Sequence, residues 1–254
     1  MGKQEQVRLL DNKGLRVDGR RVDELRPIKL EVGLLDKANG SAYIEHGRNK
    51  ILVGVFGPRE AHPKHIALAD RAVVKCRYHM APFSTDERKS PAPSRRELEL
   101  SKVIRESLEP AIMSEYFPRA TIDIYIEVLQ ADAGTRCAGI TAASLALADA
   151  GIPMRELVAA CAAGKVAGKV VLDLSDIEDK QGDADLPVAL MPKSNVISLI
   201  QMDGSLSEDE FRQALDMSTN ACRQIYEMQR EALRQKYHMV REEPEKEEIA
   251  EVKA

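Results

Sequence analysis

Residues 121–129 constrain the fold more than any other part of the chain, because apolar and polar side chains alternate along them. A period of two predicts a β-strand with one buried face and one polar face. Residues 139–150 are small and apolar on nearly every side, which predicts a buried helix that ends at Gly151. Burying both elements requires a sizeable core, and the 44% of hydrophobic residues in this chain of 254 can supply one.

The same order of elements, strands followed by a helix, is predicted twice. In the first half, strands are predicted at residues 41–45, 50–56, 71–78 and 121–129, and Ser94 with Glu97 forms a capping box that opens a helix. In the second half, strands are predicted at residues 157–163, 165–174, 186–191 and 195–202, Asp203-Gly204 forms a turn, and a capping box of Ser207 with Glu210 opens a helix to about His238. We therefore predict an α+β fold of two similar units, residues 1–150 and 151–240, followed by an acidic tail at residues 241–254.

The composition narrows the range of partners. With 41 acidic and 37 basic residues the net charge is −4, so a polyanion would have to be held by local basic clusters. The four cysteines form no CxxC pair, which gives no sign of a zinc knuckle or a redox motif. No apolar run approaches the roughly 20 residues of a membrane span. We therefore expect a cytoplasmic protein with reduced thiols and no membrane partner.

The first candidate site is the start of the helix that Ser94 caps. Arg95 and Arg96 would occupy its first turn, where free backbone N–H groups and the positive end of the helix dipole already lie. Two guanidinium groups are unfavourable there unless an anion binds, so the pattern predicts a phosphate site. The alternative is a solvated basic pair that Glu97 and Glu99 partly offset.

The second candidate site is the turn at residues 132–136, between the alternating strand and the buried helix. Gly134 permits a positive φ and a close backbone approach, Thr135 supplies a hydroxyl, and Arg136 supplies a bidentate donor. Backbone amides at such a junction can cradle a phosphate. The sequence matches neither a P-loop nor a dinucleotide fingerprint, and the alternative is an ordinary tight turn.

The third candidate site is a carboxylate-rich loop at residues 178–185. Carboxylates on a loop can bind Mg²⁺, or one of them can be protonated by its neighbours and act as a general acid. The alternative is a solvated acidic turn. The sequence offers no Ser/His/Asp set and no cysteine paired with a histidine, so covalent catalysis has no support, and His62 and His65 are expected to be exposed loop residues.

Three stretches in fixed order resemble the RNase PH family: residues 62–112, with SPAPSRRELE; residues 117–153, with QADAGTRCAGIT; and residues 173–192, with DIEDKQGDAD. The resemblance extends from about Arg16 to Tyr237. Within the family it is closest to the catalytic RNase PH-like subunit of the archaeal exosome. It implies a fold of two similar α+β units and a phosphorolytic 3′→5′ exoribonuclease. In that reaction inorganic phosphate attacks RNA and releases nucleoside diphosphates.

The resemblance also implies roles for individual residues. It assigns phosphate binding to Gly134, Thr135, Arg136 and Arg96, RNA binding to Arg95, Arg96 and Lys64, general acid catalysis to Asp185, and a role as metal ligand or acidic partner to Asp179. Mg²⁺ would be held by Asp179 and Asp185, and Asp183 matches no required position. The implied partners are single-stranded RNA, an inactive RNase PH-like paralogue in a hexameric ring, and RNA-binding cap subunits.

Two alternatives remain open at this point. One is a stand-alone RNase PH that trims the 3′ ends of transfer RNA as a homohexamer. The other is a ring subunit that binds RNA without catalysis, a class that loses the acidic pair or the phosphate turn. The presence of both features in this sequence favours an active enzyme.

Overall fold

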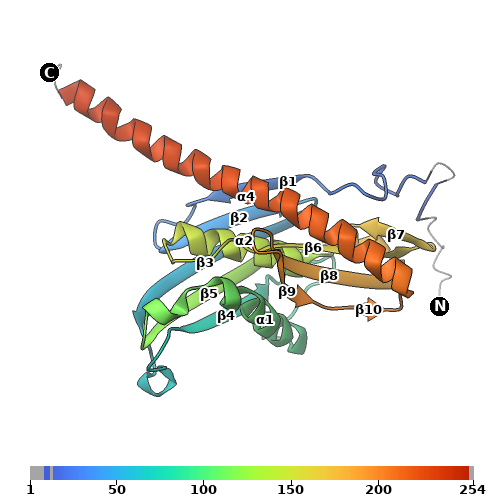
Figure 1. Ribbon diagram of the computed structural model, residues 1–254, viewed down its shortest axis with the longest axis horizontal. Coiled ribbons are helices and arrows are strands. Elements are labelled where there is room, and N and C mark those ends of the chain that lie inside the picture. The colour runs from blue at the N-terminus through green and yellow to red at the C-terminus, as the bar shows by residue number, and fades with distance from the viewer. Residues whose placement is uncertain (1–8, 12–13, 252–254) are drawn as a thin grey trace.

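The computed structural model describes residues 9–11 and 14–251, and it contains two five-stranded sheets. Figure 1 shows them with helix α2 between them and the long helix α4 across the second sheet. The strands are β1 (Ile28–Val32), β2 (Gly40–His46), β3 (Asn49–Glu60), β4 (Val73–Met80), β5 (Ala120–Gln130), β6 (Ala159–Val166), β7 (Lys169–Leu172), β8 (Ala184–Met191), β9 (Val196–Ile200) and β10 (Asp203–Gly204). The α-helices are α1 (Arg95–Leu108), α2 (Thr135–Asp149), α3 (Asp176–Gln181) and α4 (Glu208–Glu251), and three short 3₁₀ helices lie at Lys64–Ile66, Glu109–Ala111 and Ser114–Tyr116.

The first sheet has the strand order β1-β2-β3-β5-β4, in which only the β4–β5 pair is parallel. The alternation at residues 121–129 is confirmed, since the four apolar side chains of β5 from Ile122 to Val128 are at most 1% exposed. Ser94 caps α1 through the predicted capping box with Glu97. These local signals were sufficient because each depends on neighbouring residues only.

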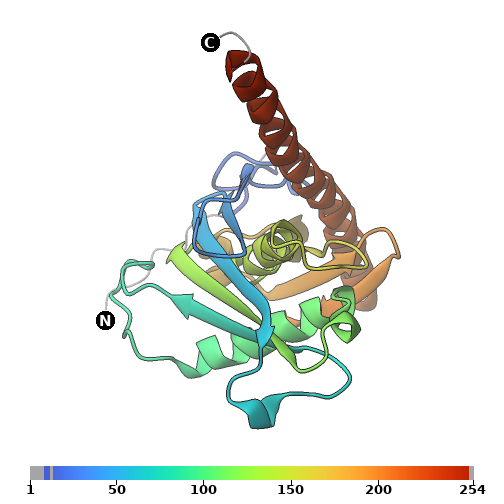
Figure 2. The same ribbon diagram turned by 90° about the vertical axis from the view of Figure 1, so that its left-hand side faces the viewer.

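Helix α2 holds the two sheets together. It contacts β2 and β3 of the first sheet and β6 of the second, and its residues from Cys137 to Leu147 are buried. Small side chains allow strands to approach from opposite sides of one helix, which explains its uniform apolar character. Figure 2 shows α2 enclosed by the sheets. The predicted buried helix is therefore confirmed, although it begins at Thr135 rather than Gly139.

The second sheet has the order β10-β8-β6-β7, with β9 paired to β8. Strand β6 runs through Gly164 to Val166, so the predicted break at residue 164 is wrong and the turn lies at Ala167-Gly168, where both φ angles are positive. The capping box of Ser207 with Glu210 opens α4 as predicted. Asp203-Gly204 is not a turn, because it pairs with Asp185 and Ala184 as β10.

Two further differences concern the acidic segments. The loop predicted at residues 178–185 is confined to Gly182 and Asp183, which lie between the end of α3 and the start of β8. Ser175 and Glu178 form a capping box that opens this short helix. The helix predicted to end near His238 continues to Glu251, so the acidic tail at 241–254 belongs to α4 except for residues 252–254. Residues 252–254, like 1–8 and 12–13 of the first predicted unit, lie outside the described part.

The division of the chain at residue 150 stays a prediction. Free thiols occur at all four cysteines. Among the described residues, no helix combines the length and apolar character needed to cross a membrane.

Candidate active site

The three candidate sites meet at one cavity of about 280 Å³. The first turn of α1, the start of α2, helix α3 and the start of β8 all contribute to its walls. Its polar and charged lining residues are Thr85, Lys89, Arg96, Thr135, Arg136, Asp176, Asp179, Lys180 and Asp185, with the backbone of Gly134 among them. Segments nearly ninety positions apart, from Arg96 to Asp185, therefore surround the same space.

The start of α2 offers backbone donors to this cavity. Gly134 is the N-cap with a φ of 66°, and no side chain among the described residues caps the first amides of the helix. No acidic residue lies in the first turn either. Uncapped amides at the positive end of a helix dipole bind anions. The second candidate site is therefore a helix N-terminus open to an anion.

Thr135 and Arg136 add side-chain donors beside these amides. The phenol of Tyr78 donates to Thr135 Oγ1 at 2.8 Å, and burial raises the pKa of Tyr78 to about 12, so the phenol stays protonated. The Thr135 hydroxyl is then available to donate to a ligand. Arg136 Nε is buried and has no hydrogen-bond partner among the described residues. A buried donor without a partner is costly unless a ligand or water satisfies it.

The first turn of α1 supplies a second guanidinium. Glu97 accepts hydrogen bonds from the backbone N–H of Met80 at 2.8 Å and of Ser94 at 2.6 Å, which joins the start of α1 to the end of β4. This attachment places Arg96 at the cavity wall. Arg95 is exposed and does not line the cavity.

Asp179 on α3 and Asp185 on β8 supply the carboxylates. Burial, and then the charge of Asp179, raise the pKa of Asp185 to about 7, although Arg136 acts in the opposite direction. The pKa of Asp179 is also raised, mainly by burial, while Arg96 opposes the shift. Asp185 is therefore substantially protonated at neutral pH, which a carboxyl group needs in order to act as a general acid.

The pair of carboxylates limits the kind of metal that could bind. Among the described residues there is no group of three or more histidine, cysteine or acidic side chains placed to hold an ion. Mg²⁺ commonly binds through one or two carboxylates together with waters and substrate phosphates. Asp179 and Asp185 thus fit Mg²⁺ only in company with a bound phosphate.

Lys64 does not join this cavity. It lies in the 3₁₀ helix Lys64–Ile66, is exposed, and forms an ion pair with Glu60 at 3.3 Å. His62 and His65 are exposed beside it, as expected. Any contact of Lys64 with a polymer would therefore occur away from the cavity.

Lys89, a basic residue of the proline-containing segment 81–93, also lines the cavity. Its ammonium group donates to Met80 Sδ at 3.2 Å, which is a weak acceptor, and it has no carboxylate partner among the described residues. Lys89 lines both the cavity and an adjoining groove of about 1440 Å³. A cation at this junction favours the passage of anions from the groove into the cavity.

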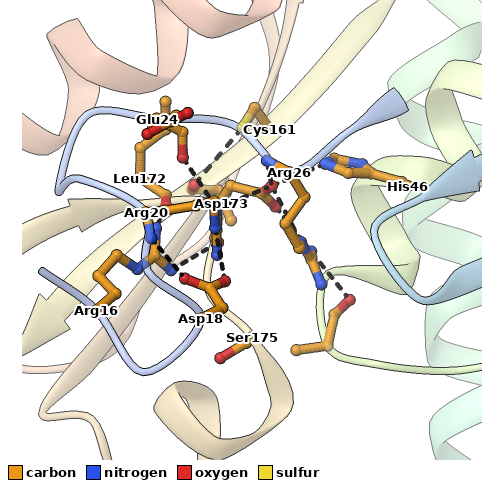
Figure 3. A network of polar contacts seen from close by, with 12 residues as sticks. Arg16, Asp18, Arg20, Glu24, Arg26, His46, Cys161, Leu172, Asp173 and Ser175 are labelled. Atoms are coloured by element: carbon orange, nitrogen blue, oxygen red, sulfur yellow. Dashed lines mark hydrogen bonds and ion pairs between the residues drawn. The ribbon is translucent and has the colours of Figure 1, made fainter. Parts of the chain in front are cut away.

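A buried ionic network lies behind the cavity, and its arginines come from the basic stretch at residues 16–26, in which the sequence alone distinguishes no single arginine. Figure 3 shows Arg16, Arg20, Arg26 and His46 gathered around Asp173, the residue after β7. Burial alone would raise the pKa of Asp173, but His46 and Arg26 hold that pKa well below its usual range. The network therefore contains a fully ionised, buried carboxylate.

Arg16 extends this network to α3. Its guanidinium donates to the carbonyl of Leu172 at 2.5 Å and to Glu178 Oε1 at 2.7 Å, and it forms a second, shorter contact with Glu178 Oε2. Glu178 in turn accepts from the N–H of Ser175 at 2.9 Å, which caps α3. Helix α3, which carries Asp179, is thus anchored through buried charge.

Comparison with known proteins agrees with this geometry. The chain matches models of the 3′ exoribonuclease family (RNase PH), with domain 1 over residues 24–153 and domain 2 over residues 156–221. It is 64% identical over 218 residues to the exosome complex component Rrp41 of Thermococcus onnurineus, covering 86% of this chain and 88% of the relative. It is 61% identical over 215 residues to the Rrp41 component of Methanopyrus kandleri, covering 85% and 90%.

Two solved structures share its architecture. One is an Archaeoglobus fulgidus exosome with RNA bound to the active site, with a TM-score of 0.74, 25% identity, and coverage of 85% of this chain and 93% of that one. The other is rice Rrp46, with a TM-score of 0.78 and coverage of 86% and 100%, whose 23% identity supports likeness of fold alone. These similarities agree with the predicted fold of paired α+β units.

Proposed function

The chain belongs to the RNase PH family of 3′ exoribonucleases, and we propose that it is the catalytic subunit of an archaeal exosome that degrades RNA by phosphorolysis. The observation that carries this proposal is one cavity that holds the amides at the start of α2, Arg136 Nε, which has no hydrogen-bond partner among the described residues, and Asp185, whose pKa burial raises to about 7. Such a cavity can hold an inorganic anion and a proton donor together.

In the proposed reaction, orthophosphate lies on the amides at the start of α2, between Arg136 and Arg96. The Thr135 hydroxyl donates a further hydrogen bond to it. One phosphate oxygen attacks the terminal phosphodiester of RNA, a new P–O bond forms, and the bond to the 3′-oxygen of the preceding nucleotide breaks. The two guanidiniums offset the repulsion between two anions that must approach each other, which is where positioned positive charge contributes most to the rate.

Asp185 is the proposed general acid. It transfers its proton to the departing 3′-oxygen, so the shortened RNA leaves with a free 3′-hydroxyl and the released nucleotide is a nucleoside diphosphate. Asp179 raises the pKa of Asp185 by its negative charge, after the larger effect of burial, and so keeps the acid protonated. The nucleophile comes from solution, which agrees with the lack of an activated side-chain nucleophile in the sequence.

When Mg²⁺ is bound with the substrate phosphates, Asp179 would be its carboxylate ligand, because Asp185 has to keep its proton to act as the general acid. The ion would neutralise charge on the transferred phosphoryl group. The protein residues named above account for binding, orientation and proton transfer without a step through the ion.

RNA binding is proposed for Arg95, Arg96 and Lys64. Arg95 is exposed beside the cavity, and Lys64 is exposed on a separate 3₁₀ helix, so a strand that reaches both would extend well beyond the cavity. The proposed partners are an inactive RNase PH-like paralogue in a hexameric ring and RNA-binding cap subunits, and the proposed location is the cytoplasm. The Rrp41 relatives carry the name of an exosome component, which favours this assembly over a stand-alone enzyme that trims transfer RNA.

The test is release of nucleotides from single-stranded RNA by the chain assembled with its ring partner, with and without orthophosphate. We expect release that requires phosphate and yields nucleoside diphosphates. Release of monophosphates without phosphate would indicate hydrolysis, and RNA binding without release would indicate the non-catalytic alternative. Activity of the chain alone as a homohexamer would support the stand-alone enzyme.

A further inference from the structure

Arg26 joins the two halves of the active site although it does not line the cavity. We infer that it is a positioning residue that sets the distance between the phosphate-binding turn at residues 132–136 and the helix α3 that carries Asp179. The expected effect of Arg26 on the KM for phosphate rests on the proposed function. Its structural basis is a set of contacts that reach both segments at once.

On one side, Arg26 binds the residue that leads into α3. Arg26 Nε and Nη2 donate to the two carboxylate oxygens of Asp173 at 3.0 and 2.7 Å, and the Arg26 backbone N–H donates to Asp173 Oδ2 at 2.8 Å. His46 Nε2 lies 2.9 Å from the same oxygen. Arg26 and Asp173 are 5% and 3% exposed, so this pair is shielded from water. A bidentate, buried contact fixes orientation as well as distance.

On the other side, the same guanidinium binds the phosphate turn. Arg26 Nη1 donates to the carbonyl of Asp132 at 2.5 Å, and Nη2 reaches the carbonyl of Ala133 at 3.5 Å. Asn49 supports this contact, since its side chain donates to the Ala133 carbonyl at 2.5 Å and accepts from the Asp132 N–H at 2.6 Å. The backbone immediately before Gly134 is therefore held by two side chains.

Backbone conformation indicates why the turn needs this support. Ala133 and Asp173 have φ angles of 49° and 55°, in the left-handed region that residues with a Cβ avoid. A residue keeps a strained backbone conformation only where the surrounding contacts hold it in place, and such residues are common at functional sites. Both strained residues are contacts of Arg26. Without its guanidinium, both are expected to relax, and the α2 amides and α3 would shift relative to each other.

Arg20 provides a matched control. It is buried in the same network and donates to the carbonyl of Asp173 at 3.1 Å, to Asp18 at 2.7 Å and to the carbonyl of Glu24 at 2.9 Å. Within the described part of the chain, none of the hydrogen bonds and ion pairs of Arg20 reaches residues 132–136. Loss of Arg20 therefore removes a buried guanidinium without releasing residues 132–136, and it separates general destabilisation from loss of positioning.

The kinetic test compares Arg26→Gln, Arg26→Lys and Arg20→Gln with the wild type, each assembled with the ring partner. We expect Arg26→Gln to raise the KM for phosphate by about tenfold or more, while the Kd for RNA without phosphate stays within about twofold. Arg26→Lys keeps the positive charge but loses the paired N–H donors of the guanidinium, so we expect an intermediate KM for phosphate. Arg20→Gln should leave the KM for phosphate within about twofold even if Tm falls.

An unchanged KM in Arg26→Gln, or an equal rise in Arg20→Gln, would overturn the inference. If Arg26→Gln does not fold, the Arg26→Lys variant provides the test. An unchanged KM for phosphate in Arg26→Lys would also overturn the inference. Hydrogen exchange gives a readout that does not need activity: residues 131–138 should exchange faster in the Arg26 variants and not in Arg20→Gln. A wild type without phosphate dependence would refute the proposed function, whereas the exchange result would still decide the role of Arg26.

Discussion

Replacing Asp185 by asparagine should slow catalysis strongly and at the same time stabilise the protein. Asparagine has nearly the same shape but carries no ionisable group, so it removes both the proposed proton donor and the buried charge. General acid catalysis typically contributes a factor of about 10²–10⁴, so kcat should fall at least 10²-fold. RNA binding should persist, because Asp185 is not among the basic groups proposed to hold the polymer.

The gain in stability follows from the pKa of Asp185, which is raised from 3.8 to about 7. A raised pKa means that the unfolded chain releases this proton at lower pH than the folded chain does. Stability contributed by this group is therefore complete below about pH 4 and is lost as the pH rises to about 7. One pKa unit corresponds to about 1.4 kcal/mol, so the asparagine variant should gain at most about 4 kcal/mol in the free energy of unfolding.

Urea unfolding of the full chain between about pH 4 and pH 8 measures this effect. The difference in the free energy of unfolding between Asp185→Asn and the wild type should be near zero at the acidic end and grow with pH. Asp183→Asn is the control, because Asp183 is exposed and does not line the cavity. A difference that is independent of pH would refute the claim that Asp185 is held protonated, and unchanged RNA cleavage would remove it from the mechanism.

Other predictions concern the remaining parts of the site. The alkaline limb of the pH–kcat profile is expected near pH 7, the pKa of Asp185. Asp179→Asn should move this limb to lower pH, because the charge of Asp179 raises the pKa of Asp185. A limb at the same pH in the variant would contradict this coupling. Replacing Arg95 and Arg96 with glutamine should reduce the salt dependence of RNA binding by a slope of about 0.7 for each arginine, and an unchanged slope would exclude phosphate contacts. Gly134→Ala should destabilise the chain by about 1–2 kcal/mol and raise the KM for phosphate, because φ is 66° there; an alanine variant with unchanged kinetics would show that this backbone geometry is dispensable.

Local signals predicted much of the fold. The capping boxes that begin α1 and α4, and the alternation in β5, depend on residues a few positions apart, so the sequence contains the whole interaction. Helix α3 also had such a signal in Ser175 and Glu178. However, five of its six residues are polar or charged, and so short a segment without apolar periodicity was predicted to be a loop.

Features that depend on distant partners could not be predicted in the same way. The break predicted at Gly164 is wrong because this glycine serves close packing inside β6, where a Cβ would lie 2.3 Å from the carbonyl oxygen of Ala184. Arg26 and Asp173 are 147 positions apart, and no local pattern distinguishes this arginine from the others in the basic stretch. The family resemblance led us to expect that Arg96, Arg136 and Asp185 lie around one cavity. The spacing of the residues alone did not, because each motif could equally be a solvated basic pair, a tight turn or a solvated acidic turn.

The central claim is that orthophosphate in this cavity becomes part of the product. Incubating the assembled ring with single-stranded RNA and isotopically labelled orthophosphate tests this claim directly. We predict that the label appears in the β-phosphate of every released nucleoside diphosphate. Nucleotides released without the label, or as monophosphates, would contradict phosphorolysis at this site.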